Sequence, residues 1–170
     1  MVILDTGFLS SFFKIRKLEL ILKALGVKYL LIPATVYEEL KEAKFFQEAS
    51  NLFSFEEQDL NENRFVLVKN IDLSELKNNF FIQETSTLGC GELGCFILAE
   101  KSQEIILIDD QKAKITAKDN GLKAVSIPAF LLYCKRRNIV SLEEMKQIIN
   151  DLREKDYYEF SDESSRLLLE

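Results

Sequence analysis

Short runs of mostly apolar residues recur along the chain, and longer segments with helical spacing separate them. The apolar runs are too short to form helices, and several end at Gly, Pro or Asp, which is typical of buried strands that lead into turns. Strands that are apolar on both faces belong to parallel sheets covered by helices on both sides. The pattern predicts an α/β fold with about five such strands, at Met1–Leu4, Val27–Ile32, Phe65–Val68, Ile105–Ile108 and Leu122–Ser126.

The segments between these strands carry apolar residues three and four positions apart, as amphipathic helices do. Gly26 and Gly121 stand where glycine commonly ends a helix, and Ser141 with Glu144 forms a capping-box pattern. The spacing predicts helices at Phe8–Ile15, Leu18–Leu25, Phe45–Phe55, Leu73–Phe80, Gly91–Lys101 and Lys112–Asn120, near Asp162–Leu169, and in stretches that begin at Pro33, Pro128 and Ser141.

Length and composition agree with one globular domain. The chain has 170 residues, of which 47% are hydrophobic and 29% charged, and its 6 Gly and 2 Pro argue against flexible linkers. We therefore expect residues 1–170 to form a single domain, with residues 141–170 as a helical extension packed on it. Because no apolar run is long enough to span a bilayer and no signal-peptide pattern opens the chain, we expect a cytoplasmic protein without a membrane partner.

The residue types that are missing narrow the chemistry. The chain contains no His, which excludes Ser-His-Asp and Cys-His catalysis and acid–base catalysis by imidazole. Its three cysteines, Cys90, Cys95 and Cys134, are too few soft ligands for a structural zinc site, and we expect reduced thiols. Any catalysis must therefore depend on carboxylates, Lys, Tyr, hydroxyl groups or a metal ion.

Acidic residues recur at the predicted strand and helix ends, as Asp5, Glu38 and Glu39, Glu92, and Asp109 and Asp110. In an open parallel sheet the carboxyl ends of the strands share one edge, where function concentrates. Gathered carboxylates raise one another's pKa unless a cation lies between them, and oxygen-only ligands suit Mg²⁺ or Mn²⁺. Taken one at a time, the acids are better explained as helix caps or solvated side chains. Together they favour a metal pocket, with the choice within each adjacent pair left open.

Four local motifs follow one another between residue 1 and about residue 140. They are Val2-Ile3-Leu4-Asp5-Thr6, Ile32-Pro33-Ala34-Thr35-Val36-Tyr37-Glu38-Glu39-Leu40, Leu88-Gly89-Cys90-Gly91-Glu92 with an apolar helix after it, and Ile106-Leu107-Ile108-Asp109-Asp110 with Ala113. In this order the set resembles the PIN domain, and particularly the VapC-type toxin ribonucleases and their archaeal and bacterial relatives.

The resemblance implies a Rossmann-like fold and a ribonuclease that depends on Mg²⁺ or Mn²⁺. It implies catalytic roles for Asp5, Glu39, Glu92, Asp109 and Asp110, and metal ligation by these acids other than Glu39. It selects Glu39 over Glu38, and Thr6 would support the acids by hydrogen bonding. It further implies an RNA substrate, an antitoxin protein as partner and a homodimer.

Three positions depart from the family pattern. Gly7 stands where many relatives have Ser, Lys114 where they have Arg, and Ser126-Ile127 where Gly-Thr is expected. Lys114 keeps the positive charge but lacks the two-pronged guanidinium. These changes leave the acids intact and bear on the contacts with RNA.

Charge and aromatic content bear on the partners. The net charge of −6 argues against a broad basic groove for nucleic acid, although the candidate acids account for most of the excess. Lys114 belongs to a basic cluster that follows Asp110, so it is a candidate contact for an RNA phosphate, with a solvated helix face as the alternative. Phenylalanines concentrate in the first third, and any that are exposed would form an interface for a second protomer or a partner helix.

The leading hypothesis is a metal-dependent endoribonuclease that acts as the toxin of a toxin–antitoxin pair. Housekeeping RNA processing or repair would use the same fold and pocket, and a PIN-like adaptor would bind without cutting. A response-regulator receiver is also doubly wound with acids at strand ends. It needs an early acid pair and a mid-chain Asp after a strand, and this chain has its pair late and lacks such an Asp.

Overall fold

The computed structural model describes residues 1–72, 74 and 88–170 of the chain. Its centre is a six-stranded sheet in the order β3-β4-β2-β1-β5-β6, and every pair of neighbouring strands is parallel. The strands are β1 (Ile3–Leu4), β2 (Leu30–Pro33), β3 (Phe53–Ser54), β4 (Val66–Lys69), β5 (Ile106–Leu107) and β6 (Ala124–Val125). The predicted α/β class with a parallel sheet is confirmed.

One strand was missed, because it lies inside the predicted helix Phe45–Phe55. Only residues 46–49 are α-helical there, and a 3₁₀ turn at Ser50–Leu52 leads directly into β3. Phe53 pairs with Val66 of β4 and is 6% exposed. The Phe53 ring also packs edge-on against the Tyr37 ring and stacks on the Phe46 ring. Tertiary pairing and aromatic packing therefore override the local helical spacing here.

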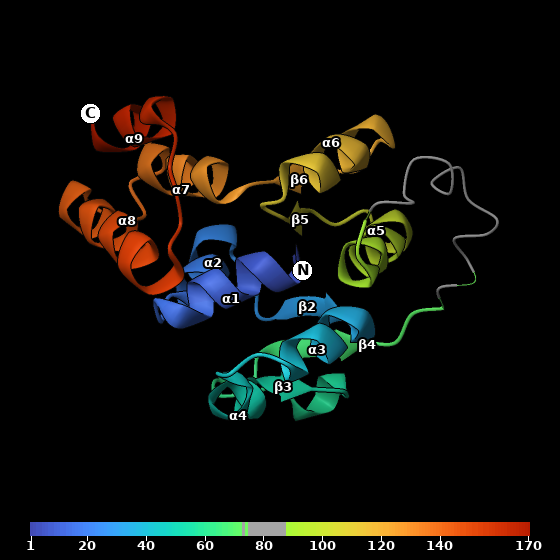
Figure 1. Cartoon of the computed structure of the whole chain (residues 1–170). Helices are drawn as coiled ribbons and strands as arrows, with labels where there is room; N and C mark the ends of the chain where they lie inside the picture. Colours follow the sequence, from blue (N-terminus) through green and yellow to red (C-terminus); the bar gives the residue numbers. More distant parts are fainter. Residues whose placement is uncertain (73, 75–87) are drawn as a thin grey trace.

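The helices flank the sheet, with α1, α2, α7 and α8 on one side and α5 on the other (Figure 1). Those described are α1 (Thr6–Lys14), α2 (Leu18–Leu25), α3 (Ala34–Lys41), α4 (Phe46–Ala49), α5 (Cys90–Ser102), α6 (Gln111–Asp119), α7 (Ile127–Arg136), α8 (Leu142–Asp156) and α9 (Asp162–Leu169). The predicted helix Leu73–Phe80 lies outside the described residues. No helix in the described ranges is both long and apolar enough to cross a membrane.

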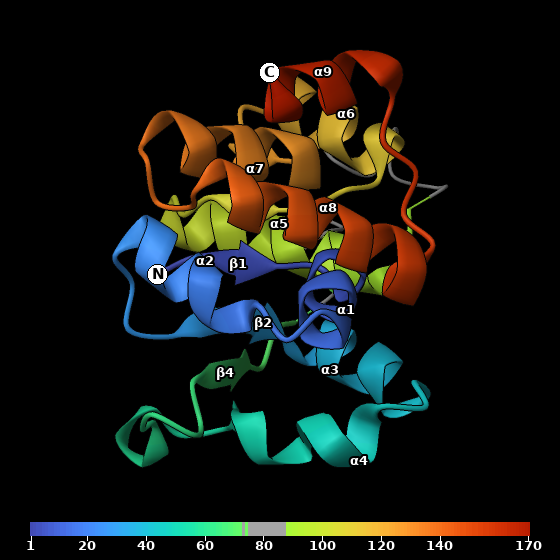
Figure 2. The same ribbon diagram turned by 90° about the vertical axis from the view of Figure 1, so that its left-hand side faces the viewer.

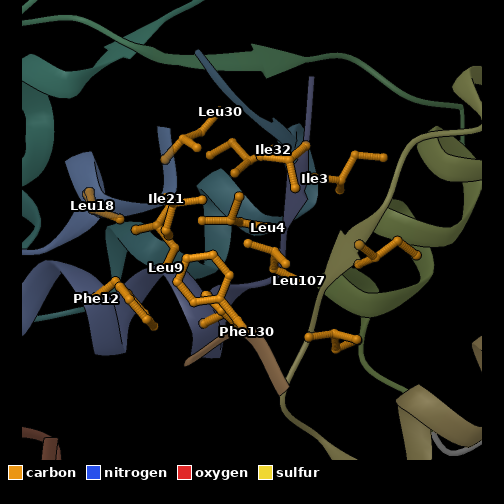
Figure 3. Close-up of a cluster of buried hydrophobic side chains, with 14 of the residues drawn as sticks. Ile3, Leu4, Leu9, Phe12, Leu18, Ile21, Leu30, Ile32, Leu107 and Phe130 are labelled. Carbon is orange, nitrogen blue, oxygen red and sulfur yellow. The ribbon is translucent and has the colours of Figure 1, made fainter. Parts of the chain in front are cut away.

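The core fills the space between β1, β2, β5 and the helices over them (Figure 3). Leu4, Leu30 and Ile32 have no exposed surface, as expected for strands covered on both faces. Phe8 and Phe12 stack with centroids 4.9 Å apart, and Phe130 of α7 meets both rings edge-on. The C-terminal helices α8 and α9 add apolar side chains to the same core.

Parallel pairing places the carboxyl ends of all six strands at the same edge of the sheet, here called the acid edge. β1 runs into α1 through Asp5, β2 into α3, and β5 into α6 through Asp109 and Asp110. The segment between α8 and α9 descends on the side toward which the β1 arrow points (Figure 2). The topology therefore brings chain segments that are far apart in sequence to this edge.

Candidate active site

Asp5 is the most buried acid of the acid edge, with 6% of its surface exposed. It caps α1, because its Oδ1 accepts a hydrogen bond of 2.7 Å from the Phe8 N–H. The pKa of Asp5 is raised from 3.8 to about 7, chiefly by burial; the charges of Glu92, Asp109 and Glu39 add to the rise, and the Phe8 N–H opposes it. Asp5 is thus both a helix cap and a carboxylate crowded by other carboxylates.

Glu39 reaches the same place from α3. Its Oε2 accepts a hydrogen bond from the Thr6 hydroxyl, and its Oε1 accepts one of 2.8 Å from the Gly91 N–H at the start of α5. The neighbouring Glu38 instead pairs with Lys41, and its side chain is 63% exposed. The structure thus brings Glu39, not Glu38, to the acid edge, and it places Thr6 where a supporting hydroxyl was expected.

Glu92 occupies the first turn of α5. Its Oε2 accepts a hydrogen bond of 2.8 Å from the Gly89 N–H, which precedes the helix. Burial raises the pKa of Glu92, and the charges of Asp110 and Glu39 add to that effect, while Lys112 opposes it. Glu92 therefore interacts electrostatically with Glu39 of α3 and with Asp110, which caps α6.

Asp109 and Asp110 are adjacent but differ in their contacts. Asp109 accepts a hydrogen bond of 2.9 Å from the Ile127 N–H at the start of α7. Asp110 caps α6 by accepting one of 2.7 Å from the Ala113 N–H, and its side chain is more exposed. Asp109 thus joins β5 to the turn after β6, whereas Asp110 faces outward beside Glu92.

A shared feature of Asp5, Glu92 and Asp110 is that a backbone N–H fixes one oxygen while the second has no hydrogen bond within the described residues. No Lys or Arg in the described part of the chain forms an ion pair with any of the five acids. Such free oxygens without a counter-charge suit a hard cation such as Mg²⁺ or Mn²⁺. Over the same residues, no three His, Cys, Asp or Glu side chains converge closely enough to hold a metal ion as they stand.

One side chain near the acids was not found from the sequence, whereas Lys112 belongs to the basic cluster predicted after Asp110. Tyr158, in the segment between α8 and α9, hydrogen-bonds Asp109, and burial together with the charges of Asp109 and Asp156 raises the pKa of its hydroxyl. The positive charge of Lys112 opposes the rise in the pKa of Glu92. Lys114, the candidate phosphate contact, is half-buried one position past Ala113. Tyr158 stands in no motif, so no sequence signal marks it.

Two of the positions that depart from the family pattern, Gly7 and Ser126-Ile127, lie next to acids of the acid edge. Gly7 is exposed, and a Cβ there would lie 3.6 Å from Asp5 Oδ2, an ordinary contact, so space alone does not require glycine. At Ser126-Ile127 the main chain, through the Ile127 N–H, supplies the hydrogen bond to Asp109. The substitution at this turn therefore leaves the support of Asp109 in place, because a backbone donor does not depend on the side chain.

No match is found among curated proteins. A family model, described as DUF3368, PIN domain, matches residues 1–169. This match spans nearly the whole chain, including every element that carries an acid of the acid edge. The chain therefore belongs to the PIN-domain family, whose fold is in general that of a nuclease.

Proposed function

We propose that this protein is a metal-dependent endoribonuclease that hydrolyses RNA phosphodiester bonds at the acid edge. The observation that carries the proposal is Asp5, a buried carboxylate crowded by Glu92, Asp109 and Glu39 with no paired cation in the described residues. Keeping like charges together is costly unless a positive ligand joins them. A divalent ion with an RNA phosphate is such a ligand.

Asp5, Glu92 and Asp110 would hold the ion, because each keeps one carboxylate oxygen without a hydrogen bond. Asp109 lies beside them but is held by Ile127 and Tyr158. When bound, Mg²⁺ or Mn²⁺ would supply an activated water and charge for the leaving oxygen. Backbone N–H groups fix one oxygen of each of these three carboxylates, and the carboxylates would have to draw closer together around the ion.

The positive side chains of α6 provide the contact for RNA in this proposal. Lys112 lies near Glu92, so it can face a phosphate held at the acids. Lys114 is the second candidate on the same helix. Because Lys acts as a point charge rather than a two-pronged donor, these contacts would favour phosphate without selecting a base.

An RNA cleavage assay with Mg²⁺ or Mn²⁺ tests the catalytic assignment. Asp5→Asn and Glu92→Gln should each slow cleavage by more than roughly 100-fold, beyond what losing an outer hydrogen-bond partner of a metal site costs. Glu38→Gln is the matched control, because Glu38 lies beside Glu39 but pairs with Lys41, and it should cut as fast as the wild type. If the wild type binds RNA but cuts nothing with either metal, the protein is an adaptor and the proposal fails.

Within this function we propose the role of a toxin that an antitoxin helix inhibits. A groove of about 630 Å³ lies between α1, α2 and α4, lined by Phe13, Leu18, Phe45 and Phe65 with charged residues at its rim. Phe13 and Phe45 stack there with centroids 4.8 Å apart. An aromatic floor with mixed charges around it suits the apolar face of an amphipathic helix.

Co-expression with the product of a neighbouring small gene tests this partner. Phe45→Glu should abolish the complex, because a charge in the aromatic floor cannot be desolvated there. Phe55→Glu is the control, since Phe55 is 56% exposed and outside the groove. If light scattering shows that the protein alone is a dimer and that Phe45→Glu makes it a monomer, the groove is instead the homodimer contact.

A further inference from the structure

We propose that Gly91 is a positioning residue of the acid edge, which holds the Glu39 carboxylate through its backbone and through its missing side chain. This inference rests on the proposed nuclease function for its catalytic part. Gly91 is the second residue of α5 and is buried. Its N–H is one that no carbonyl of the helix can satisfy, and it donates a hydrogen bond of 2.8 Å to Glu39 Oε1.

The space at Gly91 is filled by that carboxylate. A Cβ built on Gly91 would lie 2.5 Å from Glu39 Oε2 and 2.8 Å from both Cδ and Oε1. Every one of these approaches is shorter than real side chains tolerate. Because the crowded atoms are the end of a flexible side chain, Glu39 would move aside, and the cost would be the loss of its hydrogen bonds from Gly91 and Thr6. Gly91 does not adopt a positive φ, since Gly26 and Gly121 are the glycines that do in the described residues. Space, not backbone freedom, therefore accounts for glycine at this position.

The consequence for Glu39 is that both of its oxygens are engaged, one by Gly91 and one by Thr6. Thr6 immediately follows Asp5, and Gly91 immediately precedes Glu92. Glu39 thus connects the sequence neighbours of Asp5 and Glu92, two of the three acids that keep a free oxygen. This arrangement gives Glu39 a positioning role between α1, α3 and α5, with Gly91 as the residue that makes the close approach possible.

The same helix provides two controls. Gly89 lies beside the same acids, but a Cβ there would be 3.8 Å from Glu39 Oε1 and from Glu92 Oε2, which is ordinary contact. Gly94 is one turn further along, where a Cβ would lie 2.2 Å from Thr35 Oγ1 and 2.9 Å from Pro33 Cβ. Gly89→Ala therefore tests alanine without crowding, and Gly94→Ala tests crowding that does not involve Glu39.

The experiment is a double-mutant cycle between Gly91→Ala and Glu39→Ala, measured first as the urea midpoint of unfolding. Gly91→Ala should lower the midpoint in the wild type, because it displaces the Glu39 carboxylate. In the Glu39→Ala background it should raise the midpoint, because the space is empty and alanine favours a helix over glycine. Gly94→Ala should lower the midpoint in both backgrounds. The proposed contact between Gly91 and Glu39 is refuted if Gly91→Ala changes the midpoint equally with and without the Glu39 side chain.

The positioning role is read from Mn²⁺ binding by calorimetry and from RNA cleavage. Gly91→Ala should weaken Mn²⁺ binding and lower kcat by about 10-fold or more, as the loss of outer support does in metal sites. Glu38→Gln, which removes an exposed acid outside the acid edge, should change neither beyond about twofold, a difference well below that range. The double variant should be no worse than Glu39→Ala alone. If the midpoint changes sign as expected but Gly91→Ala binds Mn²⁺ and cuts like the wild type, the positioning role is refuted.

The failure of the nuclease proposal would be visible separately. A wild type that neither binds Mn²⁺ nor cuts RNA contradicts the proposed function and with it the catalytic role of Gly91. The unfolding cycle needs no metal and no RNA, so it decides the contact between Gly91 and Glu39 in either case.

Discussion

Helix α1 holds a buried or half-buried carboxylate at each of its ends, and the two are treated in opposite ways. At its start, Asp5 lies among Glu39, Glu92 and Asp109, and the described residues offer it no ion pair. At its end, Asp156 from α8 accepts hydrogen bonds from the buried Ser11 hydroxyl, at 2.5 Å, and from the Lys14 ammonium, at 2.6 Å. The side chain of Asp156 is 11% exposed.

The difference separates a stabilising carboxylate from one that costs stability. Asp156 has a counter-charge and two donors, so removing it leaves a buried hydroxyl and an ammonium without their partner. Asp5 has one donor and three acidic neighbours, so its charged form opposes folding. A buried carboxylate without a counter-charge at the end of the central strand lowers the stability of the fold. A bound cation would offset this loss, which agrees with a cation site.

The largest expected effect is the pH dependence that Asp5 imposes without divalent metal. Unfolded Asp5 ionises near pH 3.8, whereas the folded protein keeps its proton until about pH 7. The folded state binds more protons over this range, so stability should fall as pH rises from about 4 to 7 and level off above it. At about 1.4 kcal/mol per pH unit the loss is on the order of 4 kcal/mol.

Asp5→Asn should remove this loss, because the amide oxygen can still accept from Phe8 while the charge is gone. Urea unfolding in a metal chelator should show equal stability of the variant and the wild type at pH 3.5 and a more stable variant at pH 8. Asp110→Asn should gain much less stability at pH 8, because Asp110 lies at the exposed cap of α6. If the wild type instead becomes more stable than Asp5→Asn as the pH rises from 4 to 7, the charged form of Asp5 does not oppose folding.

Asp156→Ala should act in the opposite direction and destabilise the protein by about 2 kcal/mol, since a buried hydroxyl loses its partner and an ion pair is broken. Asp156→Asn should cost less, because the amide oxygen still accepts from Ser11. Chemical unfolding at pH 7 measures both. Equal stability of Asp156→Ala and the wild type would show that the Lys14 end of α1 is not the stabilised one.

Tyr158→Phe should have a smaller effect, on the order of 1 kcal/mol, because one partly buried hydrogen bond to Asp109 is lost. The Ile127 N–H still holds Asp109, so the acid stays in place and cleavage should fall only a few-fold. Thermal unfolding and the RNA assay report the two effects. Cleavage as slow as that of Asp5→Asn would assign Tyr158 a direct part in the chemistry.

The smallest effect is expected at Glu38. Glu38→Gln removes an exposed ion pair with Lys41 that lies on the solvent side of α3, and exposed pairs contribute little. Its unfolding midpoint should match that of the wild type, whereas Glu39→Gln should shift it. If the two variants behave alike, the distinction between these neighbouring acids is wrong.

The sequence determined most of the sheet and the positions of the acids along it. β1, β5 and β6 fall within the predicted strands, and β2 and β4 each end one residue beyond them, at Pro33 and Lys69. The sequence marks strands such as β1 and β2 because a strand buried on both faces needs apolar residues. Asp5 and Asp109 were each predicted as a helix cap or a pocket acid, and the structure shows Asp5 as a cap but gives the second cap to Asp110. Parallel topology, which the alternation of elements indicates, is sufficient to place these ends together.

Tertiary structure alone decided the rest. β3 exists because β4 and the Tyr37 and Phe46 rings lie beside Phe53, which local spacing does not encode. Helical spacing does not choose between Glu38 and Glu39, and the family motif that selects Glu39 gives no reason; the structure supplies one, because the Gly91 N–H, 52 positions away, reaches Glu39. Tyr158 reaches Asp109 only because α8 returns to the acid edge. A sequence pattern reports periods within one element, whereas contacts between elements depend on how those elements pack.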